Sequence, residues 1–129
     1  MFMIINTPIS LGELLDKISI LKIKKNNIFD RKKLIYINEE LNLLENVLAE
    51  SISDPKITEY IEKLVEINSL LWKIEDDIRE CEKKDQFDKK FIQLARSVYQ
   101  TNDKRSEIKL DINKTFGSKL VEVKSYEKY

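Results

Sequence analysis

Apolar residues recur along most of the chain at spacings of three and four positions, the periodicity of an α-helix with one buried face. These stripes are long and carry few breaks, so they predict helices of several turns rather than strands. The spacing predicts four helices: the first from Ser10 to about Lys25, the second from Asp30 to about Ser51, the third from Asp54 to the turn at 83–85, and the fourth from about Phe87 to Gly117.

Residues that start and stop helices flank these segments. Ser10 and Glu13 have the spacing of a capping box, in which the serine accepts a backbone N–H and the glutamate reaches back. Asp30 and Asp54 stand where the second and third helices should begin, and Gly117 is a natural stop for the fourth. The caps therefore agree with the boundaries that the apolar stripes predict.

The two ends of the chain have a different pattern. Residues 2–6 are apolar and β-prone, and residues 119–124 alternate weakly between apolar and polar. We expect two short strands here, paired with each other or across two subunits. The fold class is then mainly all-α: one domain over residues 1–129, a bundle of about four helices in which the third and fourth form a long antiparallel hairpin.

Composition narrows the function classes. The 23 basic and 23 acidic residues cancel, which argues against a nucleic-acid binder and against attraction to anionic membranes. No stretch approaches the length of a membrane span. The chain has no histidine, the commonest general base and transition-metal ligand, and its single cysteine, Cys81, fits a reducing compartment. We therefore expect a cytoplasmic protein without a bound cofactor or metal.

The fourth helix carries polar residues where its apolar stripe should continue. Thr101 and Arg105 occupy consecutive stripe positions, with Asn102 and Lys109 beside them. A buried arginine must pair, reach solvent or bind an anion, because an unpaired buried charge is costly. Two interpretations stay open: a polar layer in which Arg105 pairs with Asp16 or another carboxylate, or an anion site between helices.

A second polar cluster lies on the third helix. Trp72, Glu75 and Arg79 share one broad helix face, which is typical either of a small-molecule pocket or of an ordinary amphipathic face. In an antiparallel hairpin that turns near residue 84, Glu75 and Arg79 lie level with Arg96, whereas Arg105 and Lys109 lie farther from the turn. Completing a site at Arg105 then requires a second subunit or the first helix, which carries Asp16 and Lys17.

A third pattern points to catalysis. Glu59, Glu62, Glu82 and Asp85 are spaced loosely like the carboxylates with which all-α nucleotide pyrophosphatases hold Mg²⁺ near a triphosphate. In a chain with 23 acidic residues such a match also arises by chance. It supports the alternative of a small Mg²⁺-dependent enzyme that acts on a phosphorylated or nucleotide-linked substrate.

Four sequence blocks carry a family resemblance: Gly12–Lys24, Leu71–Arg79, Leu94–Arg105 and Gly117–Tyr126. Together they resemble an uncharacterised family of small helical proteins from bacteria and marine phages, in bacteria often encoded near surface-polysaccharide glycosyltransferases. Polar residues shared with that family are Asp16, Lys17, Glu75, Arg79, Arg96, Tyr99, Asn102, Asp103, Arg105 and Lys124.

The sequence favours a non-catalytic binding or accessory protein, which we expect to be a homodimer that takes a small anionic ligand or a partner protein. The resemblance implies a pathway related to surface polysaccharide. Catalytic residues cannot be assigned, and the candidate ligand-binding residues are Arg105, Asn102, Lys109, Arg96, Glu75, Arg79, Asp16 and Lys17.

Overall fold

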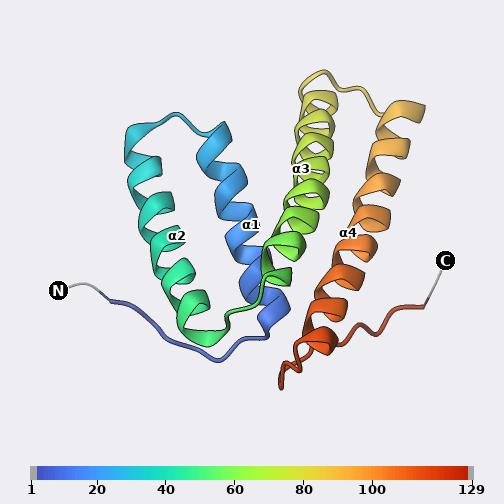
Figure 1. Ribbon diagram of the computed structural model, residues 1–129. Helices are drawn as coiled ribbons and strands as arrows, with labels where there is room; N and C mark the ends of the chain where they lie inside the picture. The colour runs from blue at the N-terminus through green and yellow to red at the C-terminus, as the bar shows by residue number, and fades with distance from the viewer. Residues whose placement is uncertain (1–2, 128–129) are drawn as a thin grey trace.

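The computed structural model describes residues 3–127, and helices account for 74% of them. In chain order they are α1 (Leu11–Asn27), α2 (Arg31–Ser51), α3 (Lys56–Lys83) and α4 (Lys89–Thr115), joined by short loops (Figure 1). The predicted all-α class is confirmed. Within this part of the chain, no helix combines the length and the apolar character needed to cross a membrane.

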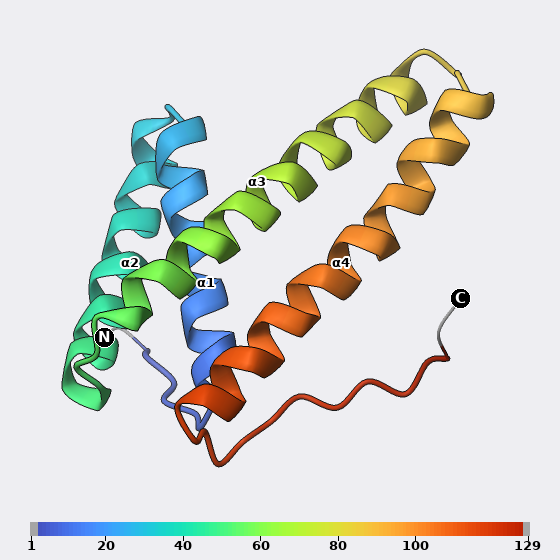
Figure 2. The ribbon, with the colours of Figure 1, turned by 45° about the vertical axis from the view of Figure 1, so that its right-hand side comes forward.

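Helix α1 is the centre of the bundle. It packs against α2, α3 and α4, whereas α2 packs closely against α1 alone. Helices α3 and α4 form the predicted antiparallel hairpin, and the two hairpins lie side by side with α1 and α3 facing each other (Figures 1 and 2). Because α1 has neighbours on three sides, a site on α4 can be completed by residues of α1.

The hydrophobic core lies where α1 meets the other helices. Leu15, Ile18, Leu64 and Ile112 are fully buried there, and they come from α1, α3 and α4. Eight of the 17 residues of α1 are buried, including the polar residues Asp16 and Ser19. The width of the apolar stripe on α1 follows from this central position.

Capping residues fix the helix ends much as the sequence predicts. The Ser10 hydroxyl accepts the backbone N–H of Glu13 at 3.1 Å, and the Asp30 and Asp54 carboxylates accept N–H groups in the first turns of α2 and α3. Gly117 follows α4 with a φ of 67°. This left-handed conformation commonly ends helices and costs little conformational free energy at glycine, which has no Cβ. One detail differs: the Glu13 carboxylate binds Lys109 of α4 instead of reaching back to Ser10.

The predicted terminal strands are wrong for the residues that the structure describes. Residues 3–6 and 119–124 form neither strand nor ladder, and Phe2 of the expected first strand lies outside the described residues. An isolated strand has no partner for its N–H and C=O groups, so alternation alone does not make one. The C-terminal segment, residues 118–127, instead runs back along α4 and is held there through side-chain charges (Figure 2).

Candidate functional site

A buried carboxylate joins three helices. The side chain of Asp16 on α1 is 1% exposed, and its Oδ1 accepts hydrogen bonds from Arg105 Nε of α4 at 2.9 Å and from Asn68 Nδ2 of α3 at 2.8 Å. Arg105 Nη2 donates to the other oxygen, Oδ2. Hydrogen bonding to Asp16 is the main cause that raises the pKa of Arg105. Bidentate pairing of this kind compensates the cost of burying the charge.

Neutral side chains orient this carboxylate. Asn68 Nδ2 also donates to Ser19 Oγ at 2.8 Å, and Ser19 Oγ donates to the backbone carbonyl of Asp16 at 2.7 Å. Ser19 is 0% exposed and Asn68 6%, so water does not compete for these bonds. The guanidinium of Arg105 is thereby held in one orientation by a network that reaches into the core.

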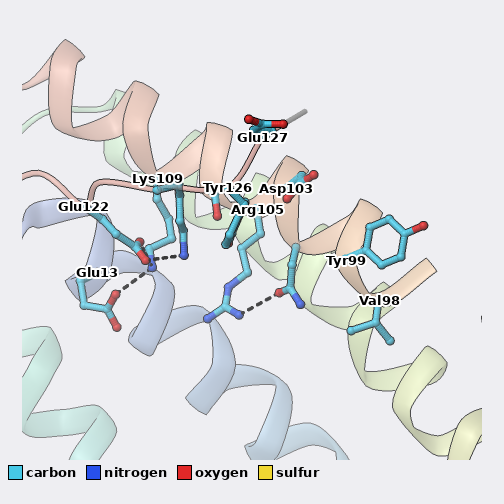
Figure 3. Close-up of a pocket in the computed structure, with 12 residues that line it drawn as sticks. Glu13, Val98, Tyr99, Asp103, Arg105, Lys109, Glu122, Tyr126 and Glu127 are labelled. Atoms are coloured by element: carbon cyan, nitrogen blue, oxygen red, sulfur yellow. Dashed lines mark hydrogen bonds and ion pairs between the residues drawn. The ribbon is translucent and has the colours of Figure 1, made fainter. Parts of the chain in front are cut away.

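A second buried charge follows one turn along α4. The Lys109 side chain is 9% exposed, and its Nζ lies 2.8 Å from Glu13 Oε2 and 2.9 Å from Glu122 Oε2. Figure 3 shows Glu13 from α1 and Glu122 from the C-terminal segment converging on it. Burial lowers the pKa of Lys109, but its hydrogen bonds to Glu13 and Glu122 outweigh that effect and raise it.

The same Glu122 also pairs with Lys124, whose Nζ lies 2.7 Å from its Oε1. Hydrogen bonds from Lys124, and then from Lys109, lower the pKa of Glu122 to about 2. The Glu122 carboxylate is therefore an anion held between two cations, and it belongs to a segment without secondary structure.

A glycine allows α1 to approach α4 this closely. Gly12 N donates to Asn113 Oδ1 at 2.7 Å, and a Cβ added at Gly12 would lie 2.6 Å from the backbone oxygen of Lys109. No larger residue fits without moving the helices. Gly12 thus sets the distance that brings Glu13 to Lys109 and Asp16 to Arg105.

Two cavities flank this network. The tail cavity, about 630 Å³, lies between α4 and the C-terminal segment (Figure 3). The Trp72 cavity, about 430 Å³, lies between α1, α3 and α4. Arg105 and Asn102 line both. The other residues that line the Trp72 cavity are Ile20, Ile23, Lys24, Asn68, Leu71, Trp72, Glu75, Asp76 and Arg79.

The structure distributes the candidate residues as follows. Glu75 and Arg79 line the Trp72 cavity with Asn102 and Arg105, and Lys109 lines the tail cavity with those same two residues. Asp16 lies buried beneath Arg105. Lys17 is exposed and lies 4.0 Å from Glu13, outside both cavities.

Arg96 is the candidate that the structure separates from the others. It is exposed and lines neither cavity. Glu75 and Arg79 line the Trp72 cavity with residues of α1 and with Arg105, so they face those residues rather than Arg96. Arg79 lies 3.9 Å from Glu75 on its own helix. The hairpin alone does not make the Trp72 cavity, because α1 supplies Ile20, Ile23 and Lys24 to its wall.

Several site residues were missed from the sequence: Ser19, Lys24, Asn68 and Glu122. One signal existed for Asn68, which follows Leu64 by one turn and so falls on the buried face of its helix. Lys24 also lies one turn beyond Ile20. Nothing local marks Glu122, because its contact depends on the path of an irregular segment.

The four carboxylates of the magnesium pattern do not come together. Glu62 and Glu82 lie twenty positions apart on the straight helix α3, which places them about 30 Å apart. Among the described residues there is no group of three or more acidic, cysteine or histidine side chains that could hold a metal ion. The spacing was therefore a chance match in an acid-rich sequence.

Comparison with known proteins places the chain in a family. It belongs to DUF6165, a family of unknown function, which it matches over residues 5–129. No curated protein and no solved structure matches it. The predicted membership of an uncharacterised family is thus confirmed.

Proposed function

We propose that this member of the DUF6165 family is a non-catalytic binding protein that holds a small anionic ligand in the Trp72 cavity. One observation carries the proposal: cationic side chains from three different helices line this one cavity, namely Lys24 of α1, Arg79 of α3 and Arg105 of α4. Convergent cations from separate elements favour an anion site, because one solvated helix face cannot bring side chains of three helices into the same cavity.

Arg105 is the oriented donor of this site. Its Nε and Nη2 are occupied by Asp16, while the bond from Nη1 to Asn102 Oδ1 is long, at 3.4 Å. Nη1 can therefore donate a shorter and stronger hydrogen bond to a bound anion. Because Asp16 already fixes the guanidinium, little side-chain entropy is lost on binding.

Lys24 and Arg79 supply positive charges that are not committed to a buried ion pair. Lys24 is partly buried and has no ion-pair partner among residues 3–127. The exposed pair of Arg79 with Glu75, at 3.9 Å, is weak enough for an anion to compete with it. These two cations can thus bind a ligand without breaking a buried interaction.

Apart from the carboxylates of Glu75 and Asp76, the rest of the cavity suits the body of an organic anion. Trp72, Leu71, Ile20 and Ile23 provide apolar surface, and Asn68 and Asn102 provide amides. Its volume of about 430 Å³ lies in the range of small-molecule sites. This composition favours a ligand with a ring or short chain attached to its anionic group.

Trp72 is the single tryptophan of the chain, so its fluorescence reports on this cavity alone. We expect inorganic phosphate, nucleotides or sugar nucleotides to change that fluorescence and to raise the melting temperature. Lys24→Gln should weaken binding by about tenfold or more, since a charge-assisted hydrogen bond contributes about 1.5–3 kcal/mol. Lys25→Gln, an exposed neighbour outside the cavity, is the matched control. Absence of any response to all three classes of anion would remove the proposal.

We also propose that the protein forms a homodimer. Helix α2 exposes large apolar side chains, including Ile35 at 64%, Tyr36 at 75% and Val47 at 48%. A helix that packs against α1 alone keeps this surface open to a second copy. Light scattering at micromolar concentration tests it, and a monomeric mass would count against it.

A further inference from the structure

Lys109 is the most buried cation of the tail cavity, and it already binds a carboxylate from the chain's own C-terminal segment. Lys109 Nζ keeps one carboxylate from the helical scaffold, Glu13, and takes a second from Glu122 at 2.9 Å. Figure 3 shows the Glu122 side chain reaching from the segment toward Lys109. A carboxylate or phosphate group of a ligand can bind this buried ammonium group in the same way as the Glu122 carboxylate does.

The rest of the segment is held weakly. Residues 119–127 have no helix or strand, and their side chains are exposed, with Val123 at 86%. A segment with so little burial can leave its site at small cost in free energy. The contact of Glu122 with Lys109 is thus exchangeable, whereas that of Glu13 is part of the packing of α1 on α4.

The two cavities meet at a shared wall. Arg105 and Asn102 line both, and Lys109 follows Arg105 by four positions on α4, which places the two Cβ atoms about 5–6 Å apart on one helix face. An anionic group bound at Arg105 therefore lies at the border of the tail cavity. A second anionic group on the same molecule can reach Lys109.

We propose that the ligand carries two linked anionic groups, that the first binds at Arg105, and that the second replaces the Glu122 carboxylate on Lys109. Glu122 is then a built-in competitor for the ligand. This inference rests on the proposed function of the Trp72 cavity. The exchange substitutes one anion for another, so Lys109 stays neutralised and Glu13 stays in place.

Isothermal titration calorimetry with inorganic phosphate and with pyrophosphate tests whether a ligand replaces Glu122 on Lys109, because pyrophosphate links two anionic groups. In Glu122→Gln the competitor is gone, and we expect pyrophosphate to bind about tenfold more tightly than to the unmodified protein, with a smaller gain for phosphate. Asp103→Asn is the matched control: it removes the same charge from the same cavity, but Asp103 forms no ion pair with Lys109. An equal gain in both variants would mean general electrostatics and would overturn the inference.

A second measurement follows the segment itself. Pyrophosphate should accelerate tryptic cleavage at Lys119 and Lys124 in the unmodified protein, because the ligand releases the segment, whereas ordinary ligand binding slows proteolysis. Unchanged or slower cleavage at saturating pyrophosphate would overturn the exchange. If phosphate changes Trp72 fluorescence and these two results fail, the Trp72 site stands and only the exchange is wrong. If neither anion binds to either protein, both proposals fail.

Discussion

Arg105 on α4 binds the carboxylate of Asp16 on α1, 89 positions earlier in the chain, through both Nε and Nη2. The pair connects the two helices that also carry Lys109 and Glu13. It is partly buried, with the Arg105 side chain 27% exposed and that of Asp16 1%. Removing one partner leaves the other charge in a site with little water, so the pair is a stability element as well as part of the candidate site.

Arg105→Met should lower the free energy of unfolding at pH 7 by about 3 kcal/mol, because Asp16 is left buried with only Asn68 as donor. The double variant Arg105→Met with Asp16→Asn should lose less than the two single changes added together. Urea denaturation measures all three. Arg79→Met breaks an exposed pair and serves as control, with an expected change within about 0.5 kcal/mol. Strict additivity of the two changes would show that the pair is not coupled.

Gly12→Ala should destabilise the protein although alanine is the better helix former. Its Cβ would lie 2.6 Å from the Lys109 backbone oxygen, so α1 and α4 must separate. Helix propensity favours alanine by about 1 kcal/mol, and overpacking typically costs about 1–3 kcal/mol, so we expect a net loss. Thermal unfolding measures it. A higher melting temperature in Gly12→Ala would contradict the close approach of α1 to α4.

The carboxylate of Glu122 should stay ionised down to low pH. The pKa of this carboxyl falls from 4.5 to about 2 on folding, so its contribution to stability is fully present above about pH 4.5 and is lost as the pH falls through about 2. A side-chain NMR titration of Glu122 reads the midpoint directly. Since the hydrogen bond from Lys124 is the largest cause, Lys124→Met should move the midpoint upward more than Lys109→Met does. A midpoint near 4.5 in the unmodified protein would contradict the double pairing.

The helices were predictable because their signals are local. Apolar stripes and caps such as Ser10 and Asp30 act within one or two turns, and the structure keeps them. The polar network was predictable only in part. Arg105 stood out at a stripe position, and Asp16 was one candidate partner, but the depth of Asp16 depends on α1 being enclosed by three helices.

Local pattern failed where tertiary contacts decide the structure. The alternation of residues 119–124 suggested a strand, yet Glu122 meets a buried lysine on α4 instead, which holds the segment without a ladder. The carboxylates at 59, 62, 82 and 85 failed for a related reason. Spacing along one helix also fixes the height of a residue, and Glu62 and Glu82 lie about 30 Å apart along α3, too far for one metal ion to bind both.

Helix α2 differs from the other three in having α1 as its single close helical neighbour. It can therefore detach as a unit while α1, α3 and α4 keep their mutual packing, and with it both cavities. Sub-global opening of this kind has a lower free energy than complete unfolding. In a single copy of the protein, backbone amides of α2 should exchange with deuterium earlier than those of α3 and α4, and association through α2 should slow that exchange as the protein concentration rises.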